Sequence, residues 1–329
     1  MIAGGGSGGH VYPGLAVAEK IKQEEGQVIW CGRPYGLERK IVKGYTYCEF
    51  SAAPLRAKKV SQQLKALIIL CVGVVKMVRK IWQLRPNVLL TMGGYVSVAP
   101  AIAASIMRVP IVCFEQNAKL GMANRLIAKI AKVHLCGMKC DDSRFVCIGN
   151  PVREQIKQCK DDSKQSLLLL GGSQGAKDFY QDLLSGVVNT FTDLPVTCIV
   201  GYGNISQEHK QLMREKKVNV IEYAQDMQEI YNAAGLIVSR AGAMAISEIN
   251  KIGKRVIYLP LPSKDNHQYH NAKSQERPGV MVIENQSLEQ CIEGIKLWVD
   301  GLFPQPEAKS QDSTGEFMAY LQTYFENQK

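Results

Sequence analysis

A glycine-rich stretch near the start of the chain, "GGGSGGH" at residues 4–10, combines a flexible loop with a histidine. Glycines let backbone N–H groups approach a bound anion, and a helix that begins directly after such a loop adds the positive end of its dipole. His10 closes the loop. The stretch predicts a site for a phosphate or diphosphate group, with a histidine beside it.

A second glycine-rich turn, "GGSQG" at residues 171–175, follows the apolar run "SLLLL" and precedes a segment of helical length. Short apolar runs such as "QVIWCG", "NVLLTMGG", "VPIVCFEQN", "VTCIVGYG", "GLIVSRAG" and "RVIYLPLP" alternate with helical segments along the rest of the chain. This pattern is typical of parallel strands that are covered by helices on both faces. We therefore expect an α/β protein with two Rossmann-like, doubly wound domains that face each other across a cleft.

The domain boundary is expected near "CIGNPVREQI", where glycine and proline interrupt the alternation. This gives an N-terminal domain over residues 1–149 and a C-terminal domain over residues 150–329. The final segment, "FMAYLQTYFENQK", has the pattern of an amphipathic helix that could return to the first domain.

The chain has 329 residues and a net charge of +10, so part of its surface should attract anions. Nucleic acid, an acidic membrane and phosphorylated substrates are all compatible with that charge. No recognition motif with interleaved aromatic residues accompanies it, which argues against nucleic acid. The ten cysteines form no CxxC pair and resemble reduced thiols of a cytosolic protein, and no signal peptide is visible.

Two cofactor classes, a zinc ion and a nicotinamide dinucleotide, fit the sequence poorly. A zinc site could be drawn from four candidate ligands, His134, Cys136, Cys140 and Cys147. These residues lack the paired spacing that is usual for zinc ligands, so we expect no metal. Gly4, Gly6 and Gly9 formally satisfy the GxGxxG pattern of dinucleotide-binding proteins. The following strand, "VIWCGRPYG", ends without the acidic residue that would bind the ribose of NAD, so no cofactor is expected.

Seven ordered motifs define a more specific resemblance: "GGGSGGHVYPGLAVA", "MGGYVSVAPAIAA", "FEQNAKLGMANRLIA", "GNPVR", "LLLLGGSQGA", "SRAGAMAISEI" and "KDNHQYHNA". Together they closely resemble the MurG family of peptidoglycan N-acetylglucosaminyltransferases over nearly the whole chain. The resemblance implies the GT-B fold and transfer of N-acetylglucosamine from UDP-N-acetylglucosamine to the 4-hydroxyl of the muramic acid of lipid I. The expected product is lipid II, with inversion at the anomeric carbon and without a metal.

The resemblance also implies roles for individual residues. His10 is the first candidate for the base, Glu115 is a rival base or an acceptor-orienting residue, and Asn124 could position a sugar hydroxyl. The loop of Ser7, Gly8 and Gly9 suits either the donor diphosphate or the acceptor pyrophosphate. Family positions that contact the nucleotide sugar fall on Ser7, Gly8, Gly9, Asn117, Arg153, Ser173, Gln174, Gly175, Ala224, Ala243, Met244, Ala245, Ile246, Ser247, Glu248 and Gln268.

Two of these positions have structural alternatives. Arg153 could contact a phosphate or anchor an interdomain hinge. Glu248 could accept hydrogen bonds from ribose hydroxyls or simply stabilise the positive end of its helix.

A lipid-linked acceptor requires a membrane-facing surface, and "KKVSQQLKALIILCVGVVKMVRKIWQLRP" is the segment that could supply it. Its uninterrupted apolar run is too short to span a bilayer. A helical projection predicts a basic, solvent-facing stripe interrupted by apolar side chains, formed by Lys65, Ile69, Val72, Lys76 and Lys80. Such a stripe suits a peripheral contact with anionic lipid, although a core helix with a solvated lysine face is the alternative.

The expected location is therefore the cytoplasmic face of the cell (inner) membrane, with cell-wall synthesis or division proteins as possible partners. Three other functions stay open at this point. One is a non-catalytic scaffold that binds nucleotide sugar; the others are a lipid galactosyltransferase and a UDP-N-acetylglucosamine 2-epimerase of the same fold. An epimerase would consume UDP-N-acetylglucosamine without any acceptor.

Overall fold

The computed structural model describes residues 1–54, 60–159, 166–171, 177–201, 211, 218–222, 224, 226–263, 265–306 and 312–326. The chain divides into two compact units. The N-terminal unit comprises Met1–Arg153 together with Asp312–Lys329, and the C-terminal unit comprises Glu154–Gln311. The last helix of the chain therefore belongs to the N-terminal unit.

The N-terminal unit is built on a seven-stranded parallel sheet in the order β3-β2-β1-β4-β5-β6-β7. The inner strands are rich in valine, leucine and isoleucine and are buried on both faces, as expected for a parallel sheet between helices. The strands are β1 (Ile2–Ala3), β2 (Ile29–Gly32), β3 (Thr46–Glu49), β4 (Leu89–Thr91), β5 (Ile111–Glu115), β6 (Val133–Cys136) and β7 (Val146–Cys147).

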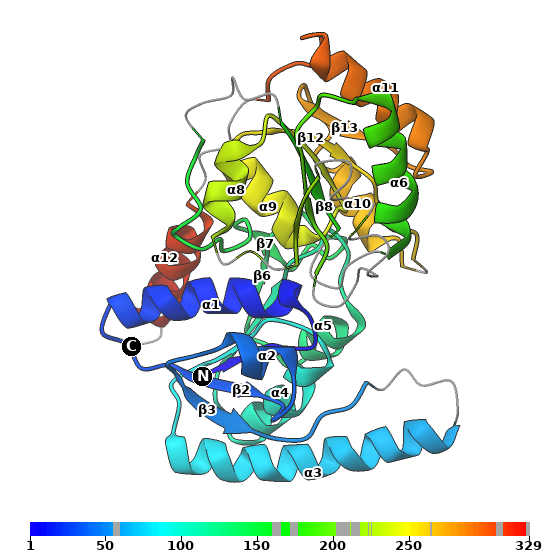
Figure 1. The fold of residues 1–329 in the computed structure, drawn as a ribbon. Coiled ribbons are helices and arrows are strands. Elements are labelled where there is room, and N and C mark those ends of the chain that lie inside the picture. The colour runs from blue at the N-terminus through cyan, green and yellow to red at the C-terminus, as the bar shows by residue number, and fades with distance from the viewer. Residues whose placement is uncertain are drawn as a thin grey trace. The chain divides into compact units, whose positions relative to one another are not determined.

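Helices cover both faces of this sheet (Figure 1). One hydrophobic core lies between the sheet and α1 (Gly8–Gln23) and α12 (Ser313–Glu326). The other lies between the sheet and α3 (Val60–Leu84), α4 (Val98–Ile106) and α5 (Met122–Ile127). The short elements α2 (Leu37–Ile41) and η1 (Tyr95–Ser97) follow β2 and β4. The carboxyl ends of β1, β4 and β5 thus bring three loops to one edge of the sheet.

The C-terminal unit repeats this plan with a six-stranded parallel sheet in the order β10-β9-β8-β11-β12-β13. Its strands are β8 (Leu167–Leu170), β9 (Val196–Ile199), β10 (Asn219–Ile221), β11 (Leu236–Ser239), β12 (Arg255–Tyr258) and β13 (Val280–Val282). Its helices are α6 (Lys177–Thr190), α8 (Met227–Ala233), α9 (Ala243–Ile252), α10 (His267–Lys273) and α11 (Leu288–Val299). Both sheets confirm the expected Rossmann-like α/β class.

The long helix α3 lies along the outside of the N-terminal unit and packs on α4 (Figure 1). Its inner face buries Ala66, Gly73, Met77 and Ile81. Its outer face leaves large apolar side chains in solvent, including Val72 at 58 % and Trp82 at 64 % exposure. Within the described ranges, no helix has the length and apolar character needed to cross a bilayer.

Candidate active site

The glycine-rich loop joins the end of β1 to the start of α1 and places His10 in the first turn of the helix. Ser7 precedes the helix in an extended conformation, and its carbonyl accepts the His10 backbone N–H at 3.2 Å. The Ser7 side chain makes no capping hydrogen bond, so the first N–H groups of α1 are not satisfied by it. The predicted arrangement of a loop, a helix start and a histidine is therefore present.

A chain of hydrogen bonds sets which nitrogen of the neutral His10 ring carries the proton. The Gln116 side-chain nitrogen donates to the Met92 carbonyl at 2.8 Å, which fixes the orientation of the Gln116 amide. The Gln116 oxygen then faces His10 Nδ1 at 3.2 Å and can only accept a hydrogen bond. In the neutral imidazole the proton therefore lies on Nδ1, and the lone pair lies on Nε2. No hydrogen-bond partner for His10 Nε2 exists among the residues that the structure describes.

The loop after β4 passes so close to this ring that two glycines are required. Gly93 and Gly94 have φ values of +79° and +75°, which favour glycine. A Cβ atom on Gly93 would lie 3.2 Å from His10 Nδ1, and one on Gly94 would lie 2.9 Å from His10 Cδ2. Gly93 and Gly94 of the "MGG" sequence therefore pack closely against the imidazole ring of His10.

Glu115, the last residue of β5, is buried with 1 % exposure and accepts four hydrogen bonds. Its Oε1 receives the backbone N–H and the side-chain amide of Asn117 at 3.0 and 2.9 Å. Its Oε2 receives the Gly121 N–H and the Asn124 side-chain amide, both at 2.9 Å. Since a carboxylate offers about four acceptor positions, these donors use its full capacity. This carboxylate therefore holds the loop over residues 116–121 in place.

Asn124 connects this loop to the ring of His10. Its side-chain nitrogen donates to the Phe114 carbonyl and to Glu115, both at 2.9 Å. A Cβ atom on Gly93 would lie 3.1 Å from the same nitrogen, so Asn124 and His10 border one glycine. The Asn124 oxygen is buried without a hydrogen-bond partner in the described part of the chain. It is an acceptor that a sugar hydroxyl could satisfy.

Glu38, which the motifs did not single out, anchors the glycine-rich loop from the other side. The side chain of this residue in α2 is fully buried, and its Oε2 accepts the Gly6 N–H at 3.1 Å. Its Oε1 accepts the backbone N–H and Nε of Arg33, both at 3.1 Å. Burial acts to raise the pKa of Glu38, but the hydrogen bonds from Arg33 and Gly6 outweigh it and hold that pKa below its ordinary value.

The remaining predicted residues of the N-terminal unit lie on the same group of loops. Gly8 is buried, whereas Ser7 and Gly9 are half-buried at the start of α1. Arg153 places its guanidinium over the Tyr12 ring, 5.0 Å from the centroid, which is a cation–π contact. Asn150 of the "GNPVR" motif donates to the Gln116 carbonyl at 3.1 Å.

In the C-terminal unit, the predicted nucleotide segment forms the start of α9. Gly242 precedes this helix and, because glycine has no polar side chain, it caps none of the first N–H groups of α9. Glu248 is buried and accepts the Tyr231 hydroxyl at 2.8 Å, and the Ser247 hydroxyl donates to the Ala243 carbonyl. This segment comprises Ala243, Met244, Ala245, Ile246, Ser247 and Glu248.

Other predicted residues of this unit are dispersed among its loops. Gln268, in α10, accepts the Leu261 N–H at 2.9 Å through its side-chain oxygen. Ala224 is half-buried after β10. Ser173, Gln174 and Gly175 lie outside the described residues.

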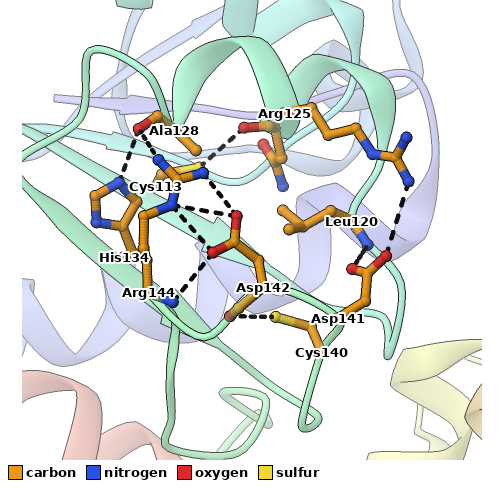
Figure 2. Close-up of polar contacts among 10 residues, drawn as sticks. Cys113, Leu120, Arg125, Ala128, His134, Cys140, Asp141, Asp142 and Arg144 are labelled. Carbon is orange, nitrogen blue, oxygen red and sulfur yellow. Dashed lines mark hydrogen bonds and ion pairs between the residues drawn. The ribbon is translucent and has the colours of Figure 1, made fainter.

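The described structure does not arrange the four residues of the zinc hypothesis as a set of metal ligands. His134 Nε2 is 2.9 Å from the Ala128 carbonyl, while the Cys140 thiol is directed at the Asp142 carbonyl (Figure 2). The Arg144 guanidinium pairs with Asp142 at 2.6 Å and donates to the same Ala128 carbonyl at 3.3 Å (Figure 2). In the described part of the protein, no group of three His, Cys, Asp or Glu side chains is arranged to hold a metal ion.

The two Rossmann-like units define the GT-B fold class, and comparison with known proteins gives the family. Residues 1–135 match the Glycosyltransferase family 28 N-terminal domain, and residues 166–319 match the Glycosyltransferase family 28 C-terminal domain. The chain therefore belongs to glycosyltransferase family 28.

Curated relatives agree over most of the chain. A protein of Coxiella burnetii (strain Dugway 5J108-111) is 35 % identical over 301 residues, which cover 86 % of this chain and 84 % of that protein. A protein of Haemophilus ducreyi is 33 % identical over 300 residues, covering 87 % and 84 %. Both are named UDP-N-acetylglucosamine--N-acetylmuramyl-(pentapeptide) pyrophosphoryl-undecaprenol N-acetylglucosamine transferase. The predicted resemblance to the MurG family is thereby confirmed.

A solved structure shows the same fold. The crystal structure of Acinetobacter baumannii MurG aligns with a TM-score of 0.72 and 24 % identity, covering 98 % of each chain. This similarity confirms the predicted fold class. It leaves the roles of individual side chains to be argued from their contacts.

Proposed function

We propose that this chain transfers N-acetylglucosamine from UDP-N-acetylglucosamine to the muramic acid 4-hydroxyl of a lipid-linked acceptor, lipid I, to give lipid II. The names of the relatives from Coxiella burnetii and Haemophilus ducreyi support the donor, the acceptor and the reaction. The His10 site supports the chemistry, because the transfer needs one group that accepts a proton from the attacking hydroxyl.

In this proposal His10 Nε2 is the general base. The observation that carries it is the hydrogen-bond chain from the Met92 carbonyl through Gln116 to His10 Nδ1, which leaves the lone pair on Nε2. As the acceptor oxygen attacks the anomeric carbon, its proton passes to Nε2 and the bond to UDP breaks. Attack from the face opposite UDP inverts the anomeric configuration. Asn124 orients the acceptor, with Glu115 fixing the Asn124 amide.

The donor is assigned to the C-terminal unit. The N–H groups at the start of α9 suit the negative charge that develops on UDP as it leaves. Glu248, whose orientation is set by the Tyr231 hydroxyl, suits the ribose hydroxyls. On the strength of the family motifs we propose further donor contacts from Asn117, Arg153, Ser173, Gln174, Gly175, Ala224 and Gln268.

The outer face of α3 is proposed as the contact with an anionic membrane surface. Lys65, Val72 and Lys76 are exposed, while Ile69 and Lys80 are half-buried. Further exposed apolar side chains that the helical projection did not select enlarge the patch: Leu64, Leu67, Ile68, Val75 and Trp82. An exposed apolar surface bordered by lysines suits shallow insertion among anionic lipid head groups.

The reaction is tested by measuring UDP release from UDP-N-acetylglucosamine with and without a lipid I analogue. We expect acceptor-dependent release that falls about 100-fold or more in His10→Ala. His134→Gln is the matched control, because the new amide can still donate to the Ala128 carbonyl, and it should retain wild-type activity. Consumption of the donor without acceptor would favour an epimerase, and donor binding without turnover would favour a scaffold.

The membrane contact is tested by co-sedimentation with phosphatidylglycerol-containing and purely zwitterionic vesicles. We expect binding to the anionic vesicles that weakens with salt and with Val72→Asp or Trp82→Ser. Tyr35→Ser is the control, since Tyr35 is 95 % exposed and lies away from α3 in the sequence. Equal binding by all variants would refute this assignment of α3.

A further inference from the structure

Three cysteine thiols gather at the edge of the N-terminal sheet. Cys136 ends β6 and pairs in register with Cys147 of β7, so the two side chains point to the same face of the sheet. Cys140 packs against the same hydrophobic core as Cys136. The Cys136 thiol interacts with both of the other thiols.

The two in-register cysteines differ in their access to solvent. Cys136 is buried with 1 % exposure, whereas Cys147 is exposed on the edge strand. Neighbouring strands lie about 4.8 Å apart, which falls within the Cα–Cα range of about 4.4–6.8 Å that a disulfide requires. An intramolecular disulfide could therefore form without a large movement of the backbone.

We propose that Cys147 and Cys136 form a peroxide-responsive dithiol site. Cys147 reacts first because it is exposed, and buried Cys136 then closes the disulfide. Neither Cys147 nor Cys136 is among the residues that we assign to the transfer reaction.

The chemistry balances with hydrogen peroxide as the oxidant. The Cys147 thiolate attacks one peroxide oxygen, the O–O bond breaks, and a sulfenic acid forms as hydroxide leaves and takes up a proton to become water. Cys136 sulfur then attacks the Cys147 sulfur, the S–S bond forms, and the S–O bond breaks. The departing hydroxide takes the proton of Cys136 and leaves as a second water. Two thiols are oxidised to one disulfide while the peroxide is reduced to two waters.

The surroundings of Cys147 favour the reactive thiolate. A hydrogen bond from Cys136 lowers the pKa of Cys147 to about 6, with support from the Gly149 backbone and the charge of Lys139. Partial burial and the Glu316 carboxylate act in the opposite direction but do not outweigh these effects. A thiol has only one proton, so Cys136 donates to Cys147 or to Cys140 at any one time. The thiolate is the form that attacks peroxide.

The dithiol site is linked to the His10 site through a short segment. Cys147 lies three residues before Asn150, whose side chain donates to the Gln116 carbonyl at 3.1 Å. Gln116 in turn holds His10 Nδ1. Closing the disulfide should pull on this segment and slow the transfer reaction, an effect that rests on the function proposed above.

The chain supplies two internal controls. Cys31 and Cys48 pair in register on β2 and β3 in the same way, but both are buried. Cys71 of α3 is exposed, but the structure describes no other thiol in contact with it. If exposure and pairing are both required, neither control should form a disulfide.

Trypsin separates the three clustered cysteines, which makes the test direct. The peptides VHLCGMK, CDDSR and FVCIGNPVR contain Cys136, Cys140 and Cys147, and ALIILCVGVVK contains Cys71. After treatment of the full chain with hydrogen peroxide at pH 6, we expect a VHLCGMK–FVCIGNPVR disulfide that dithiothreitol reverses. At this pH, Cys147 should react about tenfold faster than an ordinary exposed thiol, allowing for the weaker nucleophilicity of a low-pKa thiolate.

Variants separate the roles of the thiols. Cys147→Ser should abolish the disulfide, Cys140→Ser and Cys71→Ser should leave it intact, and Cys136→Ser should leave a sulfenic acid on Cys147 that dimedone captures. Oxidation of Cys147 no faster than that of Cys71, or any other disulfide partner, would overturn the site. Disulfide formation with unchanged UDP release in wild type would overturn only its link to His10.

Discussion

The start of α1 and the end of β5 carry the two candidate bases, His10 and Glu115, and the two side chains use their polar atoms in opposite ways. His10 is half-buried, and within the described residues its ring makes one hydrogen bond, from Nδ1 to Gln116. Glu115 is almost fully buried, and its carboxylate accepts four hydrogen bonds from Asn117, Gly121 and Asn124. One residue keeps a nitrogen available for a substrate, whereas the other has its acceptor capacity used by the protein.

This difference separates two tasks that the sequence motifs alone leave undivided. A general base needs an accessible lone pair, and His10 Nε2 provides one. A carboxylate that is saturated by backbone and amide donors is costly to protonate or displace, so it suits the task of holding a loop. The comparison therefore supports the proposal that the start of α1 carries proton transfer and that Glu115, at the end of β5, has a positioning role.

The largest effect on this comparison is expected from Gln116→Leu. Leucine removes the acceptor for His10 Nδ1, so the imidazole loses the preference for a proton on Nδ1 and its fixed orientation. We expect kcat to fall about 10- to 100-fold while the KM for the donor changes little. Steady-state kinetics measure this. Wild-type kcat in a folded Gln116→Leu protein would mean that the hydrogen-bond chain has no role in catalysis.

Glu115→Gln tests the other side of the comparison. Glutamine places an NH₂ group where one carboxylate oxygen accepts N–H donors, so the loop loses hydrogen bonds and gains a repulsive contact. We expect the variant to be destabilised by about 1–3 kcal/mol. Transfer should decline less than in His10→Ala. Urea unfolding and UDP release measure the two quantities, and an activity loss as large as that of His10→Ala without a loss of stability would favour Glu115 as the base.

Glu38→Gln tests whether the hydrogen bond from the Gly6 N–H to the Glu38 carboxylate holds the glycine-rich loop in place. The Gly6 N–H and two Arg33 donors converge on this carboxylate. Losing one charged acceptor should cost about 1–3 kcal/mol in the free energy of unfolding at pH 7. Activity should decline only through looser placement of His10, which makes this the smallest catalytic effect.

The pH dependence of that stability loss has a defined sign. The pKa of Glu38 is lowered in the folded state, so its contribution is present above the unfolded value of about 4.3 and is lost as the pH falls through the folded pKa. The stability difference between wild type and Glu38→Gln should therefore shrink below about pH 4. A difference that stays constant from pH 7 to pH 3 would contradict the assigned role.

The sequence predicts the sheets and the motif residues because these depend on local patterns. Apolar runs that end at glycine mark β1, β4, β8 and β11, and the loop that follows β1 carries His10. Chain segments such as β7 and β10 escape prediction because they are short and partly exposed. The helical projection of the α3 sequence predicts a basic stripe. It does not predict the exposure of Trp82, because that exposure depends on how α3 packs on α4.

Gln116 and Glu38 could not be assigned from the sequence for a different reason. Gln116 lies 106 positions from His10, and Glu38 lies 32 positions from Gly6, so their contacts arise only when distant strands pair. Gln116 stands inside the "FEQN" motif, but the resemblance implies roles only for its neighbours Glu115 and Asn117. Glu38 stands in "GLERK", where a charged residue on a short helix is usually exposed.

The most direct test is the pH profile of kcat/KM for wild type, His10→Gln and Glu115→Gln with the same lipid I analogue. If His10 is the base, wild type and Glu115→Gln share a decline in kcat/KM on the acid side, and His10→Gln lacks it while keeping only residual activity. If Glu115 is the base, the acid-side decline disappears in Glu115→Gln and persists in His10→Gln. That second result would reverse the assignment of the two regions.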